Sequence, residues 1–205
     1  TIAHVMDMDH LQANVDLQAR TYNLGMVTAM LDPSLTREIC IPSGISINGN
    51  VKVDGTKYAT KLALTEGKGS MKVDATVDVK TRKDGSLDMG NLAYQAKLQA
   101  SNIQARHFLP HQELYTFTGA VEAKGVGTDF LSPRSRLIAK AKVNQVHYDK
   151  YNLHDVLADA QVANGKIHAT LDSKNDLLNG VIAVSALAST KKLQATLVAD
   201  VRHAD

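Results

Sequence analysis

Residues 70–80 read Ser-Met-Lys-Val-Asp-Ala-Thr-Val-Asp-Val-Lys, and apolar and polar side chains alternate strictly along this stretch. Successive side chains of a β-strand point to opposite faces of a sheet. Met71, Val73, Ala75, Val77 and Val79 therefore share one face, and the charged and hydroxyl side chains share the other. The pattern predicts a strand in a sheet with one apolar and one polar face.

The same alternation recurs along most of the chain. It predicts further strands at residues 11–20, 45–54, 92–101 and 193–201. Short glycine-containing sequences that favour turns interrupt the alternation. They are Asn-Gly, Asp-Gly or Gly-Lys-Gly and lie at residues 48–49, 54–55, 67–69, 84–85, 164–165 and 179–180. Asn-Gly and Asp-Gly supply the positive φ angles of tight turns, so we expect hairpins and meanders. The spacing fits roughly eleven or twelve strands in an all-β, antiparallel-rich fold.

Two segments, at residues 23–31 and 177–188, carry apolar residues at both odd and even positions and therefore do not alternate. Each is either a strand covered on both faces or a short helix. We favour a strand for 181–188 and leave 23–31 open. We expect one β domain over 1–205, with a weak internal boundary near 104–114. Thr1 stands in mid-pattern, so we interpret the chain as a fragment of a longer protein.

The composition limits the classes of function. Hydrophobic residues make up 44% and charged residues 21% of 205 residues, which excludes a disordered chain. Aromatic residues make up only 4%, with no Trp, whereas a closed sandwich usually fills its centre with large rings. The net charge of +2 arises from interleaved charges, so no nucleic-acid partner is predicted.

Motifs for catalysis are missing from the sequence. There is no Gly-x-Ser-x-Gly elbow, phosphate loop or dinucleotide fingerprint. Cys40 is the single cysteine, so no intrachain disulfide forms. Pro110 lies between His107 and His111 and prevents one helix from presenting both. We predict neither an enzyme, a cofactor nor a metal site.

Residues 91–205 resemble a known family in their strand and turn sequences. The strings that carry the resemblance are His107-Phe108-Leu109-Pro110, Tyr115-Thr116-Phe117-Thr118-Gly119, Ala123-Lys124-Gly125-Val126-Gly127-Thr128-Asp129-Phe130, Tyr151-Asn152-Leu153, Ala163-Asn164-Gly165-Lys166 and Ala199-Asp200-Val201. They are similar to the TamB (translocation and assembly module) family of the AsmA-like superfamily, in its Bacteroides-type form. None of these strings is a catalytic signature.

The resemblance implies an elongated, strongly curved sheet, a U-shaped trough or β-taco, in the periplasm of a Gram-negative bacterium. The full-length protein would be anchored at the inner membrane and would reach toward the outer membrane. Its apolar groove would transport phospholipids between the two membranes, and an outer-membrane barrel partner (TamA-like) or barrel clients would link it to outer-membrane protein assembly. The resemblance carries over no catalytic residue.

The candidate groove residues rest on strand parity, and the occupants we expect are phospholipid acyl chains. They are Met71, Val73, Val77, Val79, Leu92, Tyr94, Leu98, Leu137 and Val143. One alternative is a closed β-sandwich that serves as a scaffold or adhesin segment without a ligand. A second is edge binding of unfolded barrel strands. A fragment could also dimerise and hide its groove, since a large apolar surface is unfavourable in water.

Overall fold

The computed structural model describes residues 2–3, 11–20, 40, 42–82, 84, 86, 88–110, 112–130, 132–188 and 193–204. Within these residues, twelve strands and one short helix follow one another: β1 (Ile2–Ala3), β2 (Gln12–Arg20), β3 (Ile45–Asp54), β4 (Lys57–Glu66), β5 (Gly69–Asp78), β6 (Ala93–Gln104), α3 (Ala105–Phe108), β7 (Leu114–Val126), β8 (Arg136–Tyr148), β9 (Tyr151–Ala163), β10 (Lys166–Lys174), β11 (Leu178–Ala188) and β12 (Leu193–Ala204).

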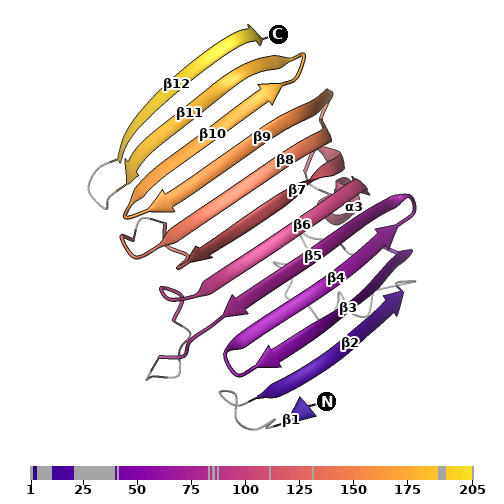
Figure 1. Ribbon diagram of the computed structural model, residues 1–205. Helices are drawn as coiled ribbons and strands as arrows, with labels where there is room; N and C mark the ends of the chain where they lie inside the picture. Colours follow the sequence, from indigo (N-terminus) through magenta and orange to yellow (C-terminus); the bar gives the residue numbers. More distant parts are fainter. Residues whose placement is uncertain are drawn as a thin grey trace.

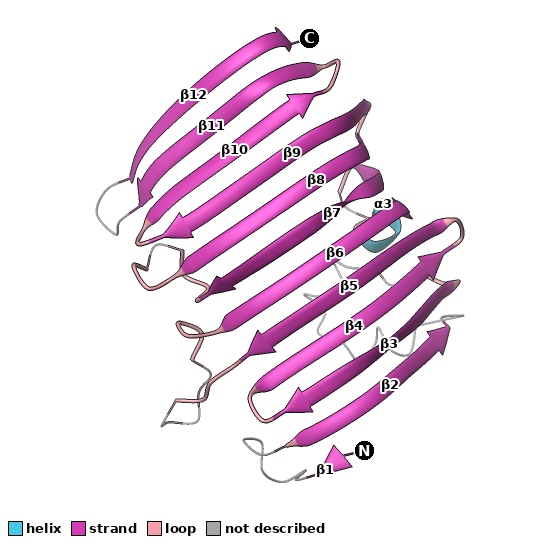
Figure 2. Cartoon of the chain, viewed as in Figure 1, coloured by secondary structure: helices cyan, strands magenta, loops and turns pink. Residues whose placement is uncertain are grey.

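These strands form a single antiparallel sheet in which spatial order equals sequence order (Figure 1). The strands β1 and β12 lie at opposite edges, so the sheet is open and is not closed into a barrel. Figure 2 shows that strands dominate the chain and that the long strands are bowed. The prediction of an all-β, elongated and curved antiparallel sheet is therefore confirmed.

The predicted strands are found where the alternation placed them. The segments 11–20, 45–54, 70–80, 92–101 and 193–201 correspond to β2, β3, β5, β6 and β12 within a few residues. The segment that is apolar on both parities forms β11, so the preference for a strand at 181–188 is also confirmed. The segment 23–31 lies outside the described residues.

The predicted turns are only partly correct. Gly55, Gly67 and Gly165 have φ angles of 57°, 56° and 70° and lie in hairpin turns. Gly49 and Gly180 were also expected in turns, but they lie inside β3 and β11. At both positions an added Cβ would run into the backbone of the neighbouring strand, so close approach of two strands explains these glycines better than a turn does.

The connection at 104–114 contains α3, the only helix among the described residues. Figure 2 shows α3 at the end of the sheet between β6 and β7. These two strands pair from Ala93↔Val126 to Gln104↔Thr116, so the sheet continues across the connection. The Arg106 guanidinium lies 5.5 Å from the ring centroid of Tyr115, which attaches the helix to β7.

Irregular pairings at the same end of the sheet bend several strands. The register shifts between Ala100 and Ile103 on β6 and between Thr118 and Gly119 on β7. Asn102 and Asp155 have positive φ angles of 50° and 52°. Inserted residues of this kind bend a strand and increase its local twist, which accounts for part of the curvature.

The sheet has no second layer among the described residues. The apolar side chains that are buried are Ile45, Ala100, Ile103, Ala105 and Val162. The chain exposes 14017 Å², whereas a compact protein of this mass exposes roughly 9,300 Å². The two-layer sandwich considered above is therefore not the arrangement of the described strands.

Candidate functional site

The register places apolar side chains of successive strands on one side of the sheet, here called the apolar face. Directly opposed residues of paired strands point to the same side. Val73 pairs with Leu98, which pairs with Val121 of the next strand. These three side chains are half-buried or exposed, Val121 being 36% accessible to solvent. The apolar face is thus continuous and largely uncovered where it is described.

Seven of the nine predicted groove residues lie in strands and share the apolar face. Two pairs are directly opposed, Val73 with Leu98 and Val77 with Tyr94. Leu137 and Val143 extend the same face onto β8 through their β7 partners Gly125 and Gly119. The seven residues are Met71, Val73, Val77, Tyr94, Leu98, Leu137 and Val143, and each is half-buried.

The other two predicted groove residues lie immediately outside strands. Val79 follows β5, and its backbone N–H donates to the Thr56 carbonyl at 2.9 Å. Leu92 precedes β6, and its carbonyl accepts from the Gly127 N–H at 2.9 Å. Both backbones are held by these loop contacts, so the strand register does not place their side chains.

A row of alanines along the centre of the apolar face escaped the sequence reasoning. Six alanines pair in one unbroken line across β5 to β10: Ala75, Ala96, Ala123, Ala139, Ala160 and Ala169. We call this line the alanine row. On β5, β6 and β10 its neighbours on the same face are larger, such as Val73 and Val77 on β5. Strand parity alone shows that the alanines face the apolar side, but only the register shows that they align.

An apolar hollow follows the alanine row between β7 and β11. Its volume is about 290 Å³, and its walls include Val121, Ala139, Ala160, Ala169, Leu171 and Ile182. Because alanine side chains are short, they leave space above the backbone along the bottom of the hollow. Larger residues such as Leu171 and Ile182 stand beside this space. Such a surface can hold an aliphatic chain but offers no fixed polar contact for a specific orientation.

Large side chains cover the glycines of the apolar face. A Cβ at Gly125 would meet the Tyr94 ring, and one at Gly119 would meet the Phe117 ring. Tyr94 is the direct cross-strand partner of Gly125. Burial raises the pKa of the Tyr94 phenol. Neither ring lines the apolar hollow.

Charged side chains on the other side of the sheet, here called the polar face, form a second ordered row. Lys61, Asp74, Lys97, Glu122, Lys140 and Asp159 are paired in sequence across β4 to β9. We call this line the charge row. Its Nζ-to-carboxylate distances are 3.8 Å for Lys61–Asp74, 3.3 Å for Lys97–Glu122 and 3.6 Å for Lys140–Asp159. The signs alternate at every step, so each charged residue has opposite charges beside it.

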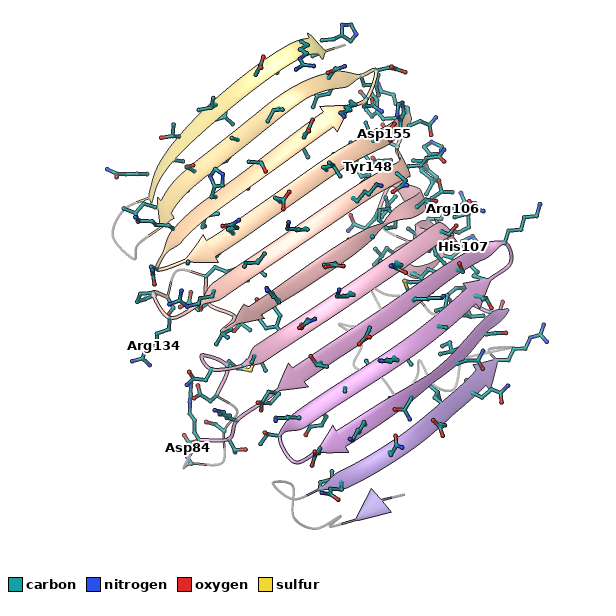
Figure 3. All side chains as sticks on the ribbon, in the orientation of Figure 1. Asp84, Arg106, His107, Arg134, Tyr148 and Asp155 are labelled. Atoms are coloured by element: carbon teal, nitrogen blue, oxygen red, sulfur yellow. The ribbon has the colours of Figure 1, made fainter. Side chains whose placement is uncertain are left out.

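Titratable side chains outside the charge row lie at both ends of the sheet. Figure 3 places His107 and Asp155 at the end that carries α3, and Asp84 at the opposite end. His107 Nδ1 contacts the Glu66 carboxylate, whose other oxygen is buried and has no hydrogen-bond partner among the described residues. The hydrogen bond to Asp155 raises the pKa of His154. No three His, Cys, Asp or Glu side chains come together as a metal site in the part of the chain that the structure describes.

Comparisons with known proteins leave the family open. No family model, curated protein or solved structure matches the chain. Across the described residues, none of the helical structure is long and apolar enough to cross a membrane. The similarity to the TamB family therefore stays a prediction from sequence, and the geometry of the two faces carries the functional argument.

Proposed function

We propose that the chain is a segment of a TamB-like, AsmA-like protein of the bacterial envelope whose apolar face binds phospholipid acyl chains. In this proposal the full-length protein spans the periplasm from an inner-membrane anchor. Phospholipid moves along the groove between the inner and outer membranes. An outer-membrane barrel partner would connect the same protein to the assembly of outer-membrane proteins.

The observation that supports this proposal best is the uncovered apolar face with its alanine row. A stable soluble domain normally buries such a face against a second layer. Each methylene removed from water contributes about 0.8 kcal/mol of favourable free energy, so burying an acyl chain against this surface favours binding. Because the alanine row repeats the same side chain at each strand, neighbouring positions offer nearly equal binding free energy, and a bound chain can slide.

Site-specific photocrosslinking tests the proposal. A photoreactive benzoylphenylalanine replaces Val121, which lies on the apolar face, and the full-length protein is irradiated in cells. We expect crosslinked phospholipid, detected by mass spectrometry. Leu98→Asp places a charge beside the reporter and should reduce the lipid adduct at least about tenfold, because a buried carboxylate loses its hydration.

The control for this substitution is Gln99→Asp, on the same strand but on the polar face, which should leave the lipid adduct unchanged. Leu98→Asp could instead unfold the sheet, so the far-ultraviolet circular dichroism of each variant is compared. Ala96→Leu provides a second test, since it fills the alanine row without adding charge and should also reduce the adduct. Undiminished lipid crosslinking in folded Leu98→Asp and Ala96→Leu variants would refute the assignment.

A second candidate function has one observation in its favour. Among the described strands, β12 pairs with β11 alone, and its Leu197 and Val198 side chains are 67% and 63% exposed. A client strand could therefore add to this edge through main-chain hydrogen bonds. Photocrosslinks from position 197 to polypeptide, with none to lipid from position 121, would favour this chaperone-like function.

A further inference from the structure

One hollow of the described surface lies mainly on the polar face, and no residue of the alanine row lines it. Its volume is about 770 Å³, and it extends across β3 to β9. Most of its lining residues, such as Lys52, Lys124 and Gln161, lie on the polar side of the sheet by register. The hollow is also lined by some residues that alternate with them along the strands, among them Val77, Tyr94 and Leu137. We call it the polar-face groove. Seven adjacent strands at about 4.8 Å spacing give it a length of roughly 29 Å.

One end of the polar-face groove combines basic and apolar side chains. On β7 and β8, Lys124 is directly opposite Ile138, and Val126 is directly opposite Arg136. The four side chains form a square with two basic corners and two apolar corners, and all four line the groove. Ile138 is 41% exposed. A surface of this kind suits a ligand that carries both an anionic group and a hydrocarbon chain.

The two basic side chains are not neutralised within the described residues. The charge row runs beside the groove, and there Lys97 and Lys140 each have a carboxylate within 4 Å. Neither Lys124 nor Arg136 has such a partner among the described carboxylates, and both side chains are exposed. An Arg guanidinium presents a planar pair of donors that matches a carboxylate or phosphate.

The opposite end of the groove disfavours an anion. Two carboxylates, Asp54 and Asp78, line it there on either side of Lys57. Lys52 is the other basic residue at this end. The Asp78 carboxylate accepts a hydrogen bond from Thr56 Oγ1 at 2.8 Å. Like charges repel, so an anionic group is directed to the end formed by β7 and β8. Between the two ends the groove is lined by Ala93 of β6, whose small apolar side chain leaves room for an apolar chain.

We propose that the polar-face groove binds a linear amphiphile with a single anionic head group, a carboxylate or a phosphate monoester, held between Lys124 and Arg136. An acidic peptide fits less well, because the strands under the groove already pair on both sides and leave no backbone groups for main-chain hydrogen bonds. The proposal does not depend on lipid binding at the apolar face, which lies on the other side of the sheet.

The experiment uses a reporter inside the groove. A photoreactive benzoylphenylalanine replaces Gln161, which lines the groove opposite Ile138. The purified chain is irradiated with radiolabelled dodecanoate, dodecyl phosphate or dodecanol. We expect labelling by one or both anionic probes to exceed labelling by dodecanol, and the comparison of the two anions identifies the preferred head group. Equal labelling by dodecanol would overturn the proposal.

Charge removal provides the second readout. The double variant K124Q/R136Q should bind the anionic probe about tenfold or more weakly, since a charge-assisted hydrogen bond contributes about 1.5–3 kcal/mol. The matched control is K142Q, which removes a basic residue from the same face of β8 outside the groove. Undiminished labelling in K124Q/R136Q, or an equal loss in K142Q, would overturn the proposal.

The same double variant separates this inference from the proposed function. A second protein with benzoylphenylalanine at Val121 reports on the apolar face. K124Q/R136Q should leave phospholipid labelling at position 121 unchanged while labelling at position 161 falls. Absence of labelling at position 161 would therefore refute the anionic amphiphile site alone, and absence of labelling at position 121 would refute lipid binding at the apolar face alone.

Discussion

Reversing one charge in the charge row should destabilise the sheet in a salt-dependent way. Glu122 Oε1 lies 3.3 Å from Lys97 Nζ, and the two side chains are 57% and 52% exposed. At this exposure the pair stabilises the fold by about 0.5 kcal/mol. Glu122→Lys loses that attraction and places like charges opposite Lys97 and Lys140, each worth about 0.5 kcal/mol of repulsion. The total is about 1.5 kcal/mol.

The matched control introduces the same side chain into the same row. Thr170 is the β10 partner of Asp159, so Thr170→Lys would extend the alternation of signs by one step. We expect its stability to equal or slightly exceed that of the parent chain, by up to about 0.5 kcal/mol. Both variants add one lysine to the same row, although Glu122→Lys raises the net charge by two units and Thr170→Lys by one. Effects of opposite sign on stability would therefore report the position of the lysine and not its presence.

Thermal unfolding followed by circular dichroism measures the effect. For a chain of about this size, 1 kcal/mol corresponds to roughly 2–4 °C in Tm, so Glu122→Lys should lower Tm by about 3–6 °C at low salt. At 1 M salt the Debye length falls to about 3 Å, and most of the difference should disappear. An equal decrease in Tm at both salt concentrations would refute the conclusion that the charge row stabilises the sheet. An equal decrease in Tm for Thr170→Lys would also refute it.

Two further predictions concern single positions. Gly125→Ala should reduce the free energy of unfolding by about 1–3 kcal/mol, because its Cβ would meet a neighbouring carbonyl oxygen and the ring above it; an unchanged denaturant midpoint would contradict this. The Asp155 carboxylate raises the pKa of His154, so an NMR titration should give a midpoint above the ordinary value of about 6.5, and Asp155→Asn should lower it. Since the pKa of His154 is higher in the folded than in the unfolded chain, the stabilisation is fully present below a pH of about 6.5 and is lost as the pH rises through the folded pKa. A measured midpoint at or below about 6.5 would contradict the stabilising contact between His154 and Asp155.

The strands were predictable from sequence because their pattern is local. Alternation with a period of two is visible within ten residues, and the apolar face follows from it directly. The candidate residues Val73, Val77, Tyr94 and Leu98 share a face for this reason. The segment at 181–188 lacks alternation, so its pattern allowed either a covered strand or a short helix, and the structure forms β11 there.

The errors concern features that depend on a neighbouring strand. Asn-Gly at 48–49 resembles a hairpin turn in isolation, but Gly49 is required where Lys61 of β4 comes close. The positive φ angles at Asn102 and Asp155 also belong to irregular pairings between strands. The alanine row and the polar-face groove arise from the alignment of many strands, and no local pattern contains that alignment.

The charge row explains how such a uniform sheet keeps its register. A slip of one residue between strands would turn apolar side chains to the polar face and is strongly disfavoured. A slip of two residues keeps every side chain on its own face, and on the apolar face it is opposed at close pairs such as Tyr94 over Gly125. The same slip between β6 and β7 would move Lys97 from Glu122 to Lys124 or Ala120, replacing an attraction by a repulsion or by no interaction. The charge row therefore contributes to the alignment on which the apolar hollow depends. Substitutions in the charge row should change the apolar hollow even though their side chains lie on the opposite face.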